Sequence, residues 1–395
     1  MVRRIKADLI FPVASEPIEN GILVVGQTSG IIHDILRNVG NDLAFDEYHK
    51  GALVPGLVNA HCHLELSHMK GVVPTGTQLI PFITAIVQKR DATQAQIQKA
   101  IVAADIEMYR NGIVAVGDIS NTANTLQRKN KSKIKYHTFL EMFDFLQDAG
   151  AEAAFANYKA VLDGFVVKNG DKVTAVPHAP YSVSARLFQL INAENQHRTG
   201  SVSIHNQETL PENELFLHKT GDFVNFYEGF GISLDGFNAT RANAIHHVIE
   251  HLDKHKNTLF VHNTISTEAD IEAAHTAFQH CFWVSCPNAN LYIENALPAY
   301  QRFTQQNATV CLGTDSLSSN WGLSILEEMK TISKYHSSLS FETLLQWATL
   351  NGAKALGYEK EFGTLEIGKA PGINLINLDT KTRKLTDRTR IRRLV

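Results

Sequence analysis

The sequence has few cysteines, no long apolar run and no strong excess of charge of either sign. Its four cysteines include no Cys-x-x-Cys pair, which favours free thiols in a reducing compartment. A membrane-spanning helix needs about 18 consecutive apolar residues, and no segment comes near that length. The basic residues at the start are not followed by the apolar segment of a signal peptide. A net charge of −3 provides no basic face for nucleic acid. We therefore expect a cytoplasmic protein that binds neither membranes nor nucleic acid.

The chain is long and apolar enough for a large core. It has 395 residues, of which 44% are hydrophobic, and such a length suits one α/β barrel of roughly 250–300 residues with a smaller unit beside it. Between residues 54 and 361, short apolar runs alternate with helical patterns. We expect strands at 54–60, 113–119, 134–143, 173–180, 201–205, 258–262, 282–286 and 309–314. Eight strand–helix units predict a (β/α)8 TIM-like barrel over 54–361, with the active site at the carboxyl ends of its strands.

Both ends of the chain show a different pattern of apolar and polar residues. Residues 1–53 contain short β segments separated by Gly, Asn and Ser clusters, and a similar pattern returns over 362–395. Neither segment shows a long helical pattern. We expect the two segments to combine into one small β-sandwich, built from residues before and after the barrel.

Two histidines end the first predicted barrel strand. Because side chains alternate along a strand, His61 and His63 face the same side and Cys62 faces the other. Two imidazoles at the carboxyl end of a buried strand form half of a divalent metal site. Two histidines can also lie near a strand end without a function, so the assignment depends on the residues that end the other strands.

Three further polar residues follow later strands and could complete such a site. His205 ends the fifth predicted strand and would supply a third imidazole. Glu208, three residues on, suits proton transfer between water on the metal and a substrate nitrogen. Asp315 follows the eighth strand, which is next to the first in a closed ring. It could bind the metal and accept a proton from the water, although an aspartate here would also suit a helix N-cap.

His262 and His178 lie at the ends of the sixth and fourth predicted strands. His262 could hydrogen-bond the water or the developing tetrahedral oxygen, or act as an additional ligand. His178 lies between two prolines in a stiff loop, and we expect it to hydrogen-bond the substrate rather than the metal; a structural turn histidine is the alternative. The fourth strand provides no lysine at its end to bridge two metals, so we expect one metal ion.

These motifs resemble those of the amidohydrolase superfamily, in its cytosine and adenosine deaminase-like branch. The resemblance rests on Pro55-Gly56-Leu57-Val58-Asn59-Ala60-His61-Cys62-His63, His205-Asn206-Gln207-Glu208, His262 and Gly313-Thr314-Asp315. It implies a mononuclear site, usually zinc and sometimes iron, with His61, His63, His205 and Asp315 as ligands. It also implies Glu208, His262 and Asp315 as catalytic residues and His178 as a substrate contact. Members of the family are often dimers, so a homodimer is a further expectation from the resemblance.

The resemblance implies a hydrolytic deaminase that releases ammonia from an aminated N-heterocycle. The branch includes guanine and methylthioadenosine/adenosylhomocysteine deaminases and triazine hydrolases. The segments 63–67 and 313–320 look more like aminodeoxyfutalosine deaminases, so a small 6-aminopurine nucleoside-like compound is the expected substrate. We expect Glu65, Ser67 and His68 to shape its pocket. Hydrolysis of another ring substituent or of a cyclic amide is one alternative, and a barrel that binds a ligand without catalysis is another.

Overall fold

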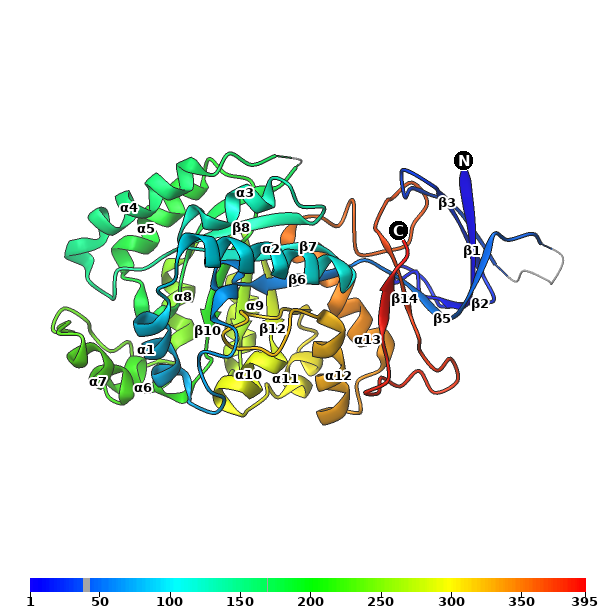
Figure 1. The fold of residues 1–395 in the computed structure, drawn as a ribbon. Coiled ribbons are helices and arrows are strands. Elements are labelled where there is room, and N and C mark those ends of the chain that lie inside the picture. The colour runs from blue at the N-terminus through cyan, green and yellow to red at the C-terminus, as the bar shows by residue number, and fades with distance from the viewer. Residues whose placement is uncertain (38–42, 169) are drawn as a thin grey trace.

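Seven short strands from both chain ends form one sheet, on the right of Figure 1. The computed structural model describes residues 1–37, 43–168 and 170–395, so 38–42 of the predicted sandwich and 169 of the predicted barrel lie outside the described residues. The strands are β1 (Val2–Ile10), β2 (Ile18–Glu19), β3 (Ile22–Gly26), β4 (Ile32–Leu36), β5 (Glu47–Pro55), β14 (Ile373–Ile376) and β15 (Ile391–Arg393). Strand β14 pairs antiparallel with β5, so residues far apart in the chain share one sheet. The arrangement of this sheet as a sandwich stays a prediction.

Two parallel sheets of four strands each form the centre of the larger body. The first contains β6 (Leu57–Cys62), β7 (Ile113–Ser120), β8 (Lys135–Met142) and β9 (Lys172–Pro177), in that order. The second contains β10 (Val202–Asn206), β11 (Asn257–His262), β12 (His280–Ser285) and β13 (Val310–Leu312). These strands occur at the eight predicted positions, with boundaries shifted by a few residues. Every residue of β6 and β7 is buried, which explains why parallel strands of this kind read as continuous apolar runs.

Backbone hydrogen bonds join the edges of the two parallel sheets. The amide of His205 donates to the carbonyl of His178 at 2.9 Å, and the amide of Thr314 donates to the carbonyl of His61 at 3.0 Å. Because ligand sites in parallel sheets form outside the carboxyl ends of the strands, the residues that follow these strands gather at one end of the body.

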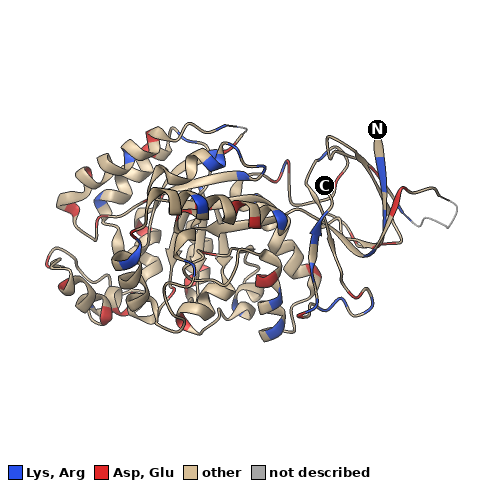
Figure 2. Ribbon diagram, in the orientation of Figure 1, with Lys and Arg blue, Asp and Glu red and all other residues tan. Residues whose placement is uncertain are grey.

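Helices connect the strands and cover the parallel sheets (Figure 1). They are α1 (Leu79–Lys89), α2 (Gln94–Arg110), α3 (Leu126–Lys129), α4 (Ala151–Gly164), α5 (Ala185–Asn195), α6 (Leu210–His218), α7 (Asp222–Gly229), α8 (Ala244–His251), α9 (Glu268–Ala277), α10 (Pro287–Glu294), α11 (Tyr300–Gln305), α12 (Ile325–Tyr335), α13 (Phe341–Gln346) and α14 (Gly352–Leu356). Thr93 and Thr267 begin α2 and α9 with capping boxes. Among the described residues, every helix is too short or too polar to cross a lipid bilayer. Basic and acidic residues are interspersed over the covering helices (Figure 2), in keeping with the small net charge.

Asn374 of β14 joins the small sheet to the larger body. Its side chain is 1% exposed and donates to the carbonyls of Gly112 at 2.9 Å and Pro55 at 3.3 Å. Gly112 follows α2 with a φ of +79°, and a Cβ atom there would lie 2.5 Å from the Asn374 amide nitrogen. Both the backbone conformation and this close approach therefore require glycine at 112.

We expect Asn374→Ala to lower the free energy of unfolding by about 1–3 kcal/mol, because it removes the side-chain donor from a buried carbonyl. Denaturant unfolding followed by circular dichroism measures this change. Asn377→Ala is the matched control, since the Asn377 side chain, which donates to the carbonyl of Arg388 and accepts from the amide of Arg390, makes both bonds at an exposed position. Its expected effect is within about 0.5 kcal/mol. Equal losses in the two variants would contradict the role of Asn374.

Candidate metal centre and active site

The four predicted metal ligands converge at the carboxyl ends of their strands. His61 lies near the end of β6, His63 follows it, His205 lies in β10 and Asp315 follows β13. The Nε2 atom of His63 lies 3.1 Å from Nε2 of His61 and 3.2 Å from Nε2 of His205. Asp315 Oδ1 lies 3.4 Å from His61 Nε2 and 3.3 Å from His63 Nε2. Three imidazole nitrogens and one carboxylate oxygen thus face a common point.

Burial determines the charge of these groups. It lowers the pKa of the His63 imidazole to about 3 and the pKa of the His205 imidazole well below its usual value, so both rings are neutral. Burial acts to raise the pKa of the Asp315 carboxyl, but its hydrogen bond with His61 and the proximity of the His63 and His262 rings hold that pKa well below its usual range. Neutral imidazoles and an ionised carboxylate are the protonation states that bind a divalent cation.

Hydrogen bonds determine which ring nitrogen faces the centre. His205 donates from Nδ1 to the carbonyl of His178 at 2.8 Å, and His262 donates from Nδ1 to Asn290 Oδ1 at 2.9 Å. Each bond leaves the lone pair of Nε2 free. The donor set therefore fits a metal such as zinc, for which imidazole and carboxylate ligands are common.

His262 belongs to the same group of donor atoms. One atom from each of His61, His205, His262 and Asp315 lies within 4.8 Å of the others. Both roles expected for His262, as an additional ligand and as a group that orients water, suit this position.

The backbone is strained where two of these side chains are aimed at the centre. Asp315 has a φ of +56° and His262 a φ of +74°, a region that costs a non-glycine residue about 1–3 kcal/mol. Ser319 Oγ donates to Asp315 Oδ2 at 2.5 Å and holds the carboxylate in place. Strain of this kind clusters at functional sites, because it persists only where the surrounding structure imposes it.

Glu208 lies beside His262. Its side chain is 3% exposed, and its Oε2 atom lies 3.6 Å from His262 Nε2. Burial, followed by the charge of Asp315, raises the pKa of the Glu208 carboxyl well above its usual value, which favours its protonated form. The backbone amide of Glu208 donates to Glu212 Oε1 at 2.6 Å, which holds the loop after β10. A protonated carboxyl here can donate a proton to a ligand in the adjoining cavity.

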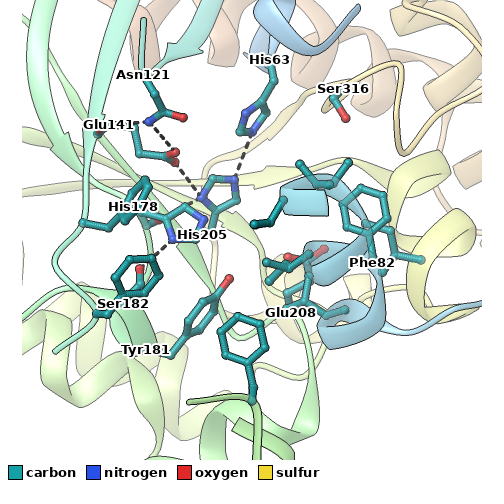
Figure 3. A pocket seen from close by; sticks show the side chains of 18 of the residues that line it. His63, Phe82, Asn121, Glu141, His178, Tyr181, Ser182, His205, Glu208 and Ser316 are labelled. Atoms are coloured by element: carbon teal, nitrogen blue, oxygen red, sulfur yellow. Dashed lines mark hydrogen bonds and ion pairs between the residues drawn. The ribbon is translucent and has the colours of Figure 1, made fainter. Parts of the chain in front are cut away.

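A cavity of about 380 Å³ adjoins the metal centre (Figure 3). Its polar part includes His63, His205, Glu208, His262 and Asp315. Its remaining wall is mostly apolar and aromatic, with contributions from Leu66, Leu79, Phe82, Ile83, Ile86, Val87, Phe143, Phe145, Tyr181, Phe226, Tyr227, Phe230, Ile232 and Ile293. Such a wall suits a ligand with a flat ring and an apolar extension.

Of the predicted substrate contacts, only His178 lines this cavity. Glu65 instead accepts hydrogen bonds from the backbone amide of Asn121 at 3.1 Å. Ser67 donates to a carbonyl of its own helical turn at 2.7 Å, and His68 contacts the carbonyl that ends α1 at 2.9 Å. The short helix η1 (Leu64–Met69) turns the three side chains toward the protein, so their positions do not support a contact with substrate.

Glu141 and Asn121 line the cavity, although the sequence did not identify them. Glu141 lies near the carboxyl end of β8, and its Oε1 atom is 3.4 Å from Nδ1 of His205. Burial raises the pKa of its carboxyl to about 8. An acidic residue near the carboxyl end of a predicted barrel strand is the signal that could have identified Glu141. The aromatic wall has no comparable signal, because it forms only when distant helices pack together.

Residues 52–393 match the model of the amidohydrolase family. The chain belongs to this family. It is 26% identical over 341 residues to an adenosine deaminase from Helicobacter pylori, across 85% of this chain and 81% of that protein. It is 28% identical over 360 residues to an aminodeoxyfutalosine deaminase from Nitratiruptor sp., across 88% of this chain and 84% of that protein. A 5'-deoxyadenosine deaminase from Methanococcus vannielii is 26% identical over 347 residues, across 82% and 74% of the two chains.

Solved structures share the fold of this amidohydrolase. Aminofutalosine deaminase from Helicobacter pylori, in complex with methylthio-coformycin, superposes with a TM-score of 0.79 at 24% identity, across 97% of this chain and 93% of that chain. An adenosine deaminase from Xanthomonas campestris with bound zinc superposes with a TM-score of 0.71 at 20% identity, across 95% and 85% of the two chains.

We expect His205→Ala to weaken zinc binding by about 100-fold or more, because it removes an imidazole from the convergent donor set. Competition with a zinc-binding dye, after metal removal and titration with zinc, measures the affinity. The control is His246→Ala, which removes a ring of α8 that is 42% exposed and outside the cavity lining. Zinc affinity equal to that of the wild type in the His205 variant would contradict the assignment.

Proposed function

We propose that this amidohydrolase is a hydrolytic deaminase of 6-aminopurine nucleoside-like compounds, of the aminodeoxyfutalosine or methylthioadenosine type. The observation that carries the proposal is the buried Glu208 carboxyl beside the four convergent ligand residues, at one end of a largely apolar cavity. The proposal assigns His61, His63, His205 and Asp315 as metal ligands. It assigns Glu208, His262 and Asp315 as catalytic groups and His178 as a substrate contact.

The residues divide the proton transfers between them. A divalent ion held by the four ligands, zinc or alternatively iron, would lower the pKa of water toward about 7. Asp315 accepts a proton from the attacking water, and His262 orients that water through its Nε2 atom. Glu208 donates a proton to the ring nitrogen beside the amino-bearing carbon, which makes that carbon electrophilic. The proton that Asp315 accepted is then delivered to the amino nitrogen, and ammonia leaves as the hydroxyl on the tetrahedral carbon returns a proton to Glu208.

The protonation state of Glu208 favours deamination over the removal of other ring substituents. A leaving amine needs a proton, whereas a leaving halide does not, and a carboxyl with a raised pKa supplies one near neutral pH. The names of the adenosine, 5'-deoxyadenosine and aminodeoxyfutalosine deaminases to which the chain is similar support the same choice.

The proposed function needs the ligand residues to lie at one end of a closed barrel. We propose that the two parallel sheets form one closed (β/α)8 barrel over 54–361, which the hydrogen bonds at both pairs of sheet edges support. Residues 1–53 and 362–395 would form the composite sandwich. The single metal ion, the homodimer and the cytoplasmic location stay predictions.

An ammonia-release screen tests the function. Aminodeoxyfutalosine, methylthioadenosine, adenosine and guanine are compared side by side with zinc-loaded protein, together with a chlorinated triazine and a cyclic amide. Release of ammonia from a nucleoside at a higher kcat/KM than from guanine is the expected result. Turnover of only the triazine or the cyclic amide would favour the alternative hydrolase, and binding of a ligand without turnover would favour a non-catalytic protein.

We expect Glu208→Gln to lower kcat for ammonia release by about 100- to 10,000-fold, because an amide cannot supply the proton. Zinc affinity is expected to remain within a few-fold of the wild-type value, since Glu208 is not an assigned ligand. The control is Glu152→Gln on α4, whose side chain is 60% exposed and distant from the cavity lining. A kcat for the Glu208 variant within threefold of the wild type would exclude this residue as the proton donor.

A further inference from the structure

A second buried carboxyl group, Glu141, lines the cavity and has an oxygen without a hydrogen-bond partner. Its side chain is 3% exposed, and its Oε1 atom is buried with no donor among the described residues. The other oxygen, Oε2, accepts a hydrogen bond from Asn121 Nδ2 at 3.2 Å, and the same amide donates to the Glu141 carbonyl at 3.0 Å. Asn121 therefore holds the carboxylate in one orientation and leaves Oε1 unpaired.

No neighbouring histidine that the structure describes donates a hydrogen bond to Glu141 Oε1. Nδ1 of His205 lies 3.4 Å from Glu141 Oε1, but this nitrogen donates its proton to the carbonyl of His178 at 2.8 Å. Nδ1 of His178 is engaged by Ser182 Oγ at 2.7 Å. Leaving an acceptor of this kind buried and unpaired is unfavourable, so a ligand that brings a donor to Glu141 gains affinity from that bond.

Glu141 and Glu208 lie on different sides of the ring of His205 (Figure 3). Glu141 contacts the Nδ1 edge of the ring, whereas Nε2 of the same ring faces the metal ligands. The ring of His205 therefore separates a donor that reaches Glu141 from the point that the metal ligands face. In a purine nucleoside the reacting amine is on the six-membered ring, and the hydroxyl donors are on the sugar at the opposite end of the molecule.

We propose that Glu141 is a specificity-determining residue that accepts a hydrogen bond from a sugar hydroxyl of the nucleoside substrate. The inference rests on the proposed deaminase function and names the part of the substrate that this site recognises. The residue takes no part in the proton transfers assigned to Glu208 and Asp315. Its carboxylate distinguishes nucleosides that carry the hydroxyl from analogues that lack it.

The test pairs enzyme variants with substrate analogues. Adenosine, 2'-deoxyadenosine and 3'-deoxyadenosine are compared with the wild type and with Glu141→Leu, which removes the acceptor. In the wild type, loss of the recognised hydroxyl is expected to lower kcat/KM by about 10- to 100-fold, because the buried acceptor is then left unpaired. In Glu141→Leu the same loss is expected to change kcat/KM by less than threefold. Equal ratios between the analogues in both proteins would overturn the proposal.

Two further variants separate recognition from damage to the fold. Glu141→Gln keeps an oxygen acceptor at the same position, and we expect it to keep the preference for the hydroxyl that the leucine variant loses. Glu152→Leu on α4 is the matched control and is expected to keep the wild-type ratios. If Glu141→Leu does not fold, as judged by its melting temperature, nucleoside binding by the wild type decides: absence of any hydroxyl preference overturns the proposal.

Binding measurements keep this inference separate from the proposed function. Calorimetry with inosine, 2'-deoxyinosine and 3'-deoxyinosine reports recognition of the sugar without turnover. A hydroxyl preference in the wild type that is lost in Glu141→Leu supports the assignment even if no ammonia is released in the screen. Absence of any hydroxyl preference in wild-type binding would overturn it. Binding of two zinc ions per wild-type chain, falling to one in Glu141→Leu, would also overturn it, because Glu141 would then be a metal ligand.

Discussion

The site depends on the burial of several imidazoles around one ionised carboxylate. His61, His63 and His205 are removed from water, so their rings stay neutral, while Asp315 keeps its charge through their proximity. Nε2 of His63 lies 3.1 Å from Nε2 of His61 and 3.2 Å from Nε2 of His205, a spacing that suits neutral rings that share one cation. The chemistry of the donor set therefore favours a cation at the common point, and the proposed function follows from that preference.

A polar network around the site supports this arrangement. Asn59 of β6 donates to Thr314 Oγ1 at 2.7 Å and accepts from the Thr314 amide at 3.0 Å, which ties the first strand to the loop that carries Asp315. Asn290 and Ser319 hold the side chains of His262 and Asp315 in the same way. Hydrogen bonds of this kind, made to the candidate ligands by neighbouring side chains, fix the rotamers of the ligands.

The cavity combines two carboxyl groups with a wide apolar wall. Glu208 and Glu141 are both buried, yet they contact different histidines: His262 in one case and Nδ1 of His205 in the other. This separation allows one carboxyl to act on the reacting ring and the other to recognise a remote group. The aromatic side chains of α1 and α7 and of the loop after β8 supply affinity for a flat ring without specifying its substituents.

Much of the site could be predicted from the sequence, because general rules relate strand ends to active sites. The alternation of apolar runs and helical patterns indicates parallel strands, and parallel strands bring their carboxyl ends to one side. His61, His63, His205 and Asp315 each lie at or just after such an end, so their convergence needed no knowledge of the loops. The same rule applies to Glu141, an acidic residue near the carboxyl end of β8.

The direction of the loop side chains and the composition of the cavity wall arise only when the chain is folded. Glu65, Ser67 and His68 follow the same strand as His63, yet the turn of η1 directs them to backbone groups. The apolar wall joins residues from helices that are far apart in the chain, and no local pattern predicts that packing. The ends of the strands, and the candidate metal-binding side chains at those ends, can be predicted from the sequence because strand ends follow from local periodicity. The direction of a loop side chain depends on dihedral angles and neighbours that arise only when the chain is folded.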